Sequence, residues 1–164
     1  MGVLVGKQAP DFTAPAVLGN GEIVDSFTLS EATKGKKAVV FFYPLDFTFV
    51  CPTELFAFQQ NLSEFEKRNT IVIGASCDTA EVHFAWLNTE KDNGGIEGVT
   101  YPIVSDSNRN LASALGILDI MKEDYNEETN SVVVEGDNVT YRATYLIDEE
   151  GTVFHESINH MPLG

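Results

Sequence analysis

Cys51 occupies a position in the sequence where a thiol can become reactive. Pro52, which is tolerated in the first turn of a helix, follows it, and Glu54 places an acid in the same turn. We therefore expect the Cys51 sulfur to lie near the free backbone N–H groups and the positive dipole end of a helix. Such a setting favours the thiolate, which is the nucleophilic form of cysteine.

The segment before Cys51 contains two further residues that can serve a reactive thiol. Pro44 and Pro52 bracket this segment and restrict its backbone. Thr48 places a hydroxyl three residues before the sulfur. The alternative is that Cys51 is a buried apolar side chain, which is the commoner fate of a lone cysteine. The helix-start position alone supports these two interpretations about equally.

The cysteine and histidine content argues against several other kinds of site. The sequence has two cysteines, Cys51 and Cys77, and three histidines that are isolated from one another. A secreted disulfide scaffold needs more cysteines, and a structural zinc site needs four ligands at short spacings. No second cysteine lies at C-x-x-C spacing, which disfavours a disulfide reductase of the thioredoxin type. We therefore expect neither a metal ion nor a cofactor.

Length and charge indicate one acidic globular domain over residues 1–164. The formal net charge is −15, which argues against nucleic-acid binding because phosphates are bound by Lys and Arg. No apolar run reaches the length of a membrane span, and the first residues do not have the pattern of a secretory signal. These features predict a cytoplasmic protein that binds neither nucleic acid nor a membrane.

The elements that must position Cys51 follow from the pattern of apolar residues. Two apolar runs, 38–44 and 70–77, predict strands that are buried on both faces. Between them, apolar side chains recur at helical spacing and predict one helix that continues to about Lys67. These side chains are Leu55, Phe58, Leu62 and Phe65.

The rest of the chain predicts a second helix and several shorter elements. Asp78 or Thr79 is expected to cap this helix, which ends before Gly94. Its apolar side is expected to comprise Val82, Ala85 and Trp86. A strand over 101–105 and a short helix over 110–115 follow.

The last third of the sequence predicts mainly strands. The acidic segment 126–138 is expected to form a hairpin or an exposed insertion, and 140–147 pairs with 152–157 in a second hairpin. Strand–helix–strand–helix followed by a strand hairpin is the order of a thioredoxin-like α/β sheet. The sequence indicates no function for the acidic run that begins at Met121.

One long stretch, FFYPLDFTFVCPTEL over 41–55, resembles the signature of the peroxiredoxins. The similarity is to the typical 2-Cys group, which includes the bacterial alkyl hydroperoxide reductase C proteins. Other segments agree with this group in order: APDF at 9–12, GGI at 94–96, YPIVSD at 101–106 and YRATYLIDEEG at 141–151. The resemblance covers essentially the whole chain. It implies the peroxiredoxin variant of the thioredoxin-like fold, and a thiol peroxidase that reduces hydrogen peroxide and organic hydroperoxides.

The resemblance also implies a role for each matching residue. Cys51 would be the peroxidatic cysteine, whose thiolate attacks the peroxide and becomes a sulfenic acid. Thr48 would hydrogen-bond the peroxide, and Pro44 would shield the sulfur from water. Arg142 would be the cation beside the thiolate, oriented by Glu54. The structural alternatives are a surface strand position for Arg142 and a helix-stabilising acid at Glu54.

The end of the sequence departs from the typical 2-Cys pattern. In that group a resolving cysteine follows the final helix, and this sequence stops at 162–164, before either of them. We therefore expect a C-terminally truncated form of the domain, without the closing helix and tail. Cys77 is a poor replacement because it ends an apolar strand, where a buried structural thiol is favoured over a redox role.

The resemblance finally implies the partners of the reaction. The substrate would be a hydroperoxide, and the electron donor a thioredoxin-like or flavoprotein disulfide reductase. The assembly would be a homodimer, with a ring of dimers as a larger form. Two other functions stay open at this point: binding of unfolded proteins by the assembled form, and thiol–disulfide exchange, which the missing C-x-x-C disfavours.

Overall fold

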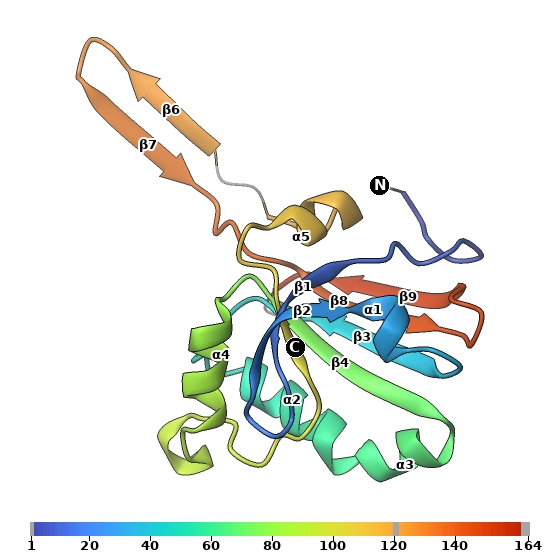
Figure 1. The fold of residues 1–164 in the computed structure, drawn as a ribbon. Coiled ribbons are helices and arrows are strands. Elements are labelled where there is room, and N and C mark those ends of the chain that lie inside the picture. The colour runs from blue at the N-terminus through green and yellow to red at the C-terminus, as the bar shows by residue number, and fades with distance from the viewer. Residues whose placement is uncertain (1, 120–121, 162–164) are drawn as a thin grey trace.

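A seven-stranded mixed sheet forms the centre of the protein (Figure 1). The computed structural model describes residues 2–119 and 122–161. Across the sheet the strands follow the order β2-β1-β5-β4-β3-β8-β9. Their bounds are β1 (Thr13–Val17), β2 (Ile23–Thr28), β3 (Lys37–Phe42), β4 (Thr70–Ser76), β5 (Ile103–Ser105), β8 (Arg142–Ile147) and β9 (Val153–Asn159).

The connection between the two central strands contains the helix that begins with Cys51. β3 and β4 are parallel neighbours, and the chain between them forms α2 (Cys51–Gln60) and α3 (Leu62–Lys67). Parallel strands need such a crossover, because a tight turn can join only antiparallel strands. β8 pairs antiparallel with the other side of β3, and β9 continues from β8 as a hairpin. This connectivity matches the predicted thioredoxin-like order.

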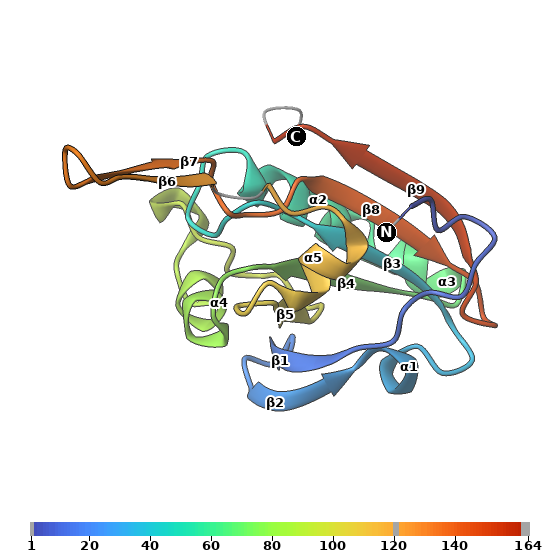
Figure 2. The ribbon, with the colours of Figure 1, turned by 90° about the horizontal axis from the view of Figure 1, so that it is seen from above.

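Helices cover both faces of the sheet. Figure 1 shows α2, α3 and α4 (Ala80–Leu87) on one side and α5 (Asn110–Leu115) on the other, and Figure 2 shows α5 lying above the central strands. Two shorter elements are α1 (Leu29–Ala32) and the 3-10 helix η1 (Lys91–Asn93). The sheet therefore separates two hydrophobic cores.

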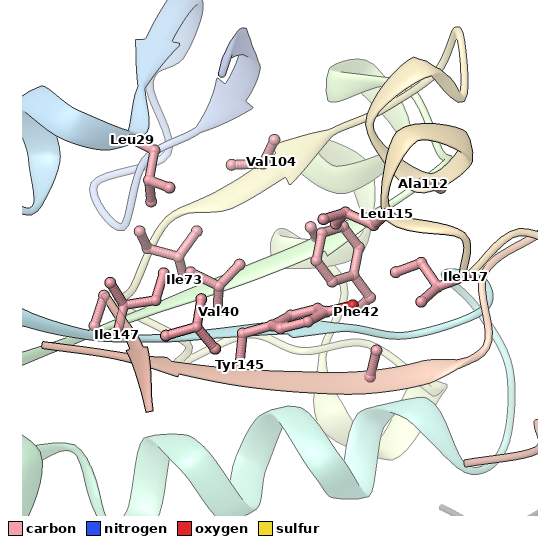
Figure 3. Close-up of a cluster of buried hydrophobic side chains, with 14 of the residues drawn as sticks. Leu29, Val40, Phe42, Ile73, Val104, Ala112, Leu115, Ile117, Tyr145 and Ile147 are labelled. Atoms are coloured by element: carbon pink, nitrogen blue, oxygen red, sulfur yellow. The ribbon is translucent and has the colours of Figure 1, made fainter. Parts of the chain in front are cut away.

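β3 contributes to both cores, because successive side chains of a strand point to opposite faces. All residues from 38 to 42 are buried, which confirms the prediction of a strand buried on both faces. The core on the α5 side, drawn in Figure 3, includes Val40, Phe42, Ile73, Leu115 and Tyr145. The core on the α2 side includes Val39, Phe41, Cys51, Leu55 and Trp86.

The predicted single helix up to Lys67 is wrong in one respect, because it is interrupted at Asn61. The backbone of Asn61 leaves the helical conformation (φ −102°, ψ 8°), and this residue separates α2 from α3. The Asn61 side-chain amide donates a hydrogen bond to the carbonyl of Ala57 at 2.8 Å. An asparagine that binds a backbone carbonyl of its own helix competes with helix continuation, which explains the break.

α4 also differs in part from the prediction. Its N-cap is Thr79, whose hydroxyl accepts a hydrogen bond from the backbone N–H of Val82. The expected apolar side is wrong at Ala85, which is exposed, while His83 is fully buried beside Trp86. A polar side chain can take this place because it has hydrogen-bond partners in the core.

The acidic segment forms a separate hairpin, as expected. β6 (Lys122–Asn126) and β7 (Ser131–Glu135) pair only with each other among the described strands, and the hairpin extends away from the sheet (Figures 1 and 2). Met121, where the acidic run begins, lies outside the described residues. Positions 162–164, where the sequence is expected to stop before a closing helix, also lie outside them.

The N-terminal hairpin of β1 and β2 is an element that the sequence analysis did not predict. It pairs with β5 through β1 and so extends the sheet on that side. None of the helices in the described part of the chain has the length and apolarity that a bilayer crossing requires.

Ile73 provides a test of the core on the α5 side. Its side chain is fully buried in β4, so Ile73→Ala should lower the free energy of unfolding by about 2–5 kcal/mol. Val133→Ala is the matched control, because Val133 is 53% exposed in the separate hairpin. The control should cost less than about 1 kcal/mol. Chemical denaturation measures both values, and equal losses would contradict this description of the core.

Candidate active site

Cys51 is the first residue of α2 and lies at the carboxyl end of β3. The loop over residues 43–50, which we call the cysteine loop, connects the two elements. Val50, the N-cap residue of α2, makes no side-chain hydrogen bond to the helix. The N-terminal end of α2 therefore presents its backbone dipoles to the buried Cys51 side chain, as the sequence predicts.

Arg142 brings a positive charge to the sulfur. It is the first residue of β8, and the pairing of Phe42 with Ala143 places it beside the carboxyl end of β3. Both terminal guanidinium nitrogens of Arg142 lie 3.7 Å from Cys51 Sγ. Arg142 is only 8% exposed, which excludes the alternative of a surface strand residue.

Glu54 is the anionic partner of this arginine. It projects from the first turn of α2, and its carboxylate accepts a hydrogen bond from one terminal nitrogen of Arg142. Burial raises the pKa of Glu54, and the positive charge of Arg142 acts against that rise. The Nε of Arg142 donates to the backbone carbonyl of Met161. The guanidinium is therefore fixed from three sides: by a carboxylate, by a carbonyl and by the sulfur.

The two predicted site residues of the cysteine loop, Pro44 and Thr48, differ in how deeply they are buried. Pro44 is buried. Thr48 is half-buried, and its hydroxyl donates a hydrogen bond to the carbonyl of Leu45 at 3.0 Å. Because this bond uses the hydroxyl proton, the Thr48 oxygen is left with acceptor capacity toward any donor that approaches it.

Cys77 lies in a different environment from Cys51. It is buried after the end of β4 and belongs to the core on the α5 side. Burial, followed by the negative charge of Asp106, raises the pKa of the Cys77 thiol to about 11. Cys77 is therefore a neutral thiol at physiological pH, which agrees with the structural interpretation of this residue.

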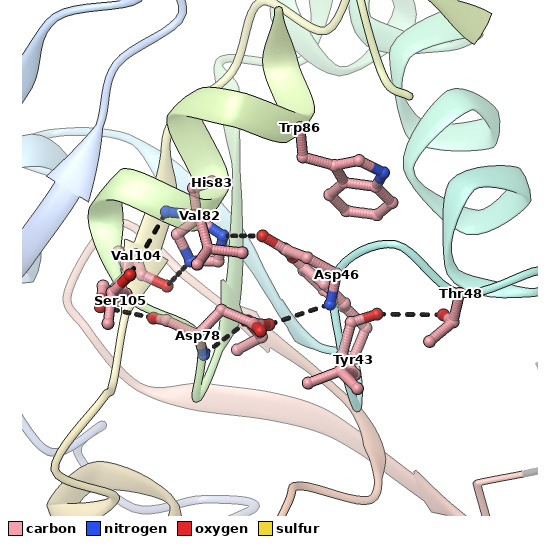
Figure 4. Close-up of polar contacts among 12 residues, drawn as sticks. Tyr43, Asp46, Thr48, Asp78, Val82, His83, Trp86, Val104 and Ser105 are labelled. Atoms are coloured by element: carbon pink, nitrogen blue, oxygen red, sulfur yellow. Dashed lines mark hydrogen bonds and ion pairs between the residues drawn. The ribbon is translucent and has the colours of Figure 1, made fainter. Parts of the chain in front are cut away.

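Sequence analysis missed a buried polar network behind the cysteine loop (Figure 4). The Tyr43 hydroxyl donates to Asp46 Oδ1 at 2.6 Å, and His83 Nδ1 lies 2.6 Å from Asp46 Oδ2. His83 Nε2 donates to the carbonyl of Val104 at 3.1 Å. Burial raises the pKa of Asp46, and the contact with His83 opposes that rise. The only signal in the sequence is a charged residue within the otherwise mostly apolar LDFTF stretch.

This network includes three residues of metal-ligand type. One ligand atom from each of Asp46, Asp78 and His83 can be chosen so that all three lie within 4.8 Å of one another. Both nitrogens of His83 are already engaged, with Asp46 and with Val104. Asp78 Oδ2 accepts from the Ser76 hydroxyl and from a backbone N–H. The arrangement is thus accounted for by hydrogen bonding within the protein.

Known proteins resemble this chain over nearly its whole length. The model of the AhpC/TSA family matches residues 5–156. Alkyl hydroperoxide reductase C of Buchnera aphidicola subsp. Baizongia pistaciae is 42% identical over 162 residues, which are 99% of this chain and 74% of that protein. Peroxiredoxin-1 of Gekko japonicus is 45% identical over 160 residues, which are 98% of this chain and 72% of that protein.

A solved structure shows the same fold. The reduced 2-Cys peroxiredoxin of Plasmodium vivax superimposes with a TM-score of 0.84 at 33% identity, over 99% of this chain and 76% of that one. The fold class expected from the sequence and the resemblance to the peroxiredoxins are both confirmed. The chain therefore belongs to the AhpC/TSA family of thiol-dependent peroxidases, the family of alkyl hydroperoxide reductase C and the 2-Cys peroxiredoxins.

Proposed function

We propose that the thiolate of Cys51 is the group that reduces the hydroperoxide in this peroxidase. The observation that carries the proposal is the position of both terminal nitrogens of Arg142, 3.7 Å from Cys51 Sγ at the start of α2. A buried guanidinium and a helix N-terminus both favour negative charge on the sulfur. Hydrogen peroxide and organic hydroperoxides are the substrate class, in line with the names of the relatives.

The reaction is a nucleophilic displacement on oxygen. The thiolate attacks the terminal oxygen of the hydroperoxide, an S–O bond forms and the O–O bond breaks. Cys51 becomes a sulfenic acid that keeps the terminal O–H, and the leaving alkoxide or hydroxide takes a proton from water. Negative charge moves from sulfur to the leaving oxygen during this step. Fixed donors that face this region therefore stabilise the transition state.

Each neighbouring residue has a defined part in this step. The guanidinium of Arg142 stabilises the thiolate before attack and the departing oxygen after it, and Glu54 fixes its orientation. Thr48 accepts a hydrogen bond from the peroxide O–H, since its own proton is donated to Leu45. Pro44 provides an apolar wall that keeps water away from the sulfur.

Turnover requires two electrons, which thiols supply. A first thiol condenses with the sulfenic acid and releases water, and a second thiol then displaces Cys51 by thiol–disulfide exchange. The burial of Cys77 and its raised pKa argue against its serving as the first thiol. The chain would work as one domain in a homodimer or a ring of dimers in the cytoplasm, with a thioredoxin-like or flavoprotein reductase as donor. The resemblance to the typical 2-Cys group supports these assignments.

The assignment of the two cysteines is tested by single substitutions. Cys51→Ser should reduce peroxide consumption to the uncatalysed rate, because serine is not ionised at neutral pH. Cys77→Ser should retain the wild-type rate within about twofold, since this thiol stays protonated. Consumption of hydrogen peroxide with excess dithiothreitol measures both. A folded but inactive Cys77→Ser variant would refute the assignment.

Arg142 and Thr48 should affect the reaction in different ways. Arg142→Met should lower both the thiolate content at neutral pH and the rate constant for hydrogen peroxide, the latter by about 100-fold. Thr48→Val should lower the rate constant by about 10-fold or more and leave the thiolate content unchanged. Ultraviolet absorbance of the thiolate and competition kinetics measure these two quantities.

Arg68→Met is the matched control for Arg142→Met. The Arg68 side chain is exposed and pairs with Glu64 on the surface. This variant should react with peroxide at the wild-type rate. Wild-type kinetics in both the Arg142 and Thr48 variants would mean that the proposed roles are wrong.

Cys77 should resist alkylation while the protein is folded. A thiol with a pKa of about 11 is almost entirely protonated at neutral pH, and its thiolate appears only as the pH rises toward that value. In a Cys51→Ser background, iodoacetamide at about pH 8 should label Cys77 only after denaturation. Intact-protein mass spectrometry detects the label. Rapid labelling of the native protein would contradict the buried position of this thiol.

A further inference from the structure

Asp78 links the cysteine loop to the sheet. It follows the end of β4, and its Oδ2 atom accepts two hydrogen bonds. One comes from the backbone N–H of Asp46 at 2.9 Å, and the other from the hydroxyl of Ser76 at 2.6 Å. Figure 4 shows the Asp78 carboxylate facing the loop near Asp46. Asp78 is not part of the reaction described above.

The backbone of Asp78 is itself held by the ends of two strands. The Ser105 hydroxyl, in the last residue of β5, donates to the Asp78 carbonyl at 2.6 Å. The Asp78 N–H donates to the hydroxyl oxygen of Ser76, the last residue of β4, at 3.2 Å. Both serines are buried. Asp78 therefore transmits the fixed position of the sheet to the loop that it contacts.

The loop needs such support because its backbone is strained. Phe47 has a left-handed conformation, with φ at 58°, which is strained for a residue other than glycine. A strained residue of this kind persists only when its neighbours are held in place. Thr48 follows it directly and turns back to the carbonyl of Leu45. The position of Thr48 thus depends on how firmly the residue before Phe47 is fixed.

That residue is Asp46, and it is held at three atoms. Its carboxylate contacts Tyr43 and His83, whereas its backbone N–H is bound by Asp78. The two side-chain contacts restrain the carboxylate, which can rotate relative to the backbone. The contact with Asp78 restrains the peptide group between Leu45 and Asp46 at its N–H, and the Thr48 hydroxyl binds the carbonyl oxygen of the same peptide group.

We propose that Asp78 is a positioning residue for peroxide reduction, which acts by fixing the backbone of the cysteine loop over Cys51. This inference rests on the proposed function of Cys51. Without the Asp78 carboxylate, the loop relaxes and carries Thr48 and Pro44 away from the line of attack. The thiolate itself is stabilised by Arg142 and by α2, and Asp78 has no hydrogen bond to either of them in the described part of the chain. Loss of Asp78 therefore slows attack on the peroxide without changing the charge on the sulfur.

Two variants of Asp78 and one neighbouring control test this proposal. Asp78→Ala removes the acceptor, whereas Asp78→Asn keeps a side-chain oxygen that can accept both hydrogen bonds. Thr79→Ala is the control, because it removes the N-cap of α4 next to Asp78 and leaves the contact with Asp46 intact. Each protein is measured for its rate constant with hydrogen peroxide, its thiolate absorbance at neutral pH and its thermal unfolding.

Asp78→Ala should lower the rate constant for hydrogen peroxide by about 10- to 100-fold, which is the size of effect expected when the reacting groups are misaligned. Its thiolate absorbance should equal that of the wild type at a temperature where it is folded. Asp78→Asn should recover the rate to within about threefold, and Thr79→Ala should keep the wild-type rate even if it unfolds at a lower temperature.

Three results would overturn the proposal. The first is a wild-type rate in Asp78→Ala. The second is a parallel loss of rate and thiolate content in Asp78→Ala, which would indicate general disruption of the site. The third is a loss of rate in Asp78→Asn that equals the loss in Asp78→Ala. A wild-type protein that does not react with hydrogen peroxide would overturn the proposed function and this inference with it. A reactive wild type with an unaffected Asp78→Ala variant would overturn this inference alone.

Discussion

The buried guanidinium of Arg142 is the constraint on which the site depends. A cation that is 8% exposed has lost most of its hydration, and this loss must be offset by anions and hydrogen-bond acceptors around it. The structure supplies Glu54, the carbonyl of Met161 and the sulfur of Cys51. Glu54 is the anionic partner, and the sulfur lies 3.7 Å from both terminal nitrogens of the guanidinium. In the proposed function, the contact between this cation and the sulfur stabilises the thiolate, which is the reactive form of the thiol.

The fold brings these groups together through strand pairing rather than through local sequence. β3 ends at the cysteine loop, and its antiparallel partner β8 begins with Arg142, so the two meet at one edge of the sheet. The parallel partner β4 ends beside the same loop, where the residues after it, together with His83 of α4, hold Asp46. In the proposed mechanism Arg142 stabilises negative charge on the sulfur, whereas the Asp46 network holds the cysteine loop. These two contributions come from different strands.

Several parts of this structure could be predicted from the sequence, and the reasons are local. The runs of β-branched and aromatic residues specify β3 and β4, and α5 has the predicted bounds because Gly116 ends it in a left-handed conformation. The contact of Arg142 with Cys51 joins residues 91 positions apart, and only the family resemblance indicated it. The burial of His83 was missed because it depends on Asp46, 37 residues away, and no spacing rule connects the two.

We propose that the first oxygen transfer is made to the sulfur of Cys51. The most direct test of this proposal treats the reduced protein with a stoichiometric amount of hydrogen peroxide in the presence of dimedone, and maps the products by tandem mass spectrometry. We predict a dimedone adduct on the peptide that contains Cys51, with Cys77 recovered as an unmodified thiol. An adduct on Cys77, or consumption of the peroxide while Cys51 stays unmodified, would contradict the account.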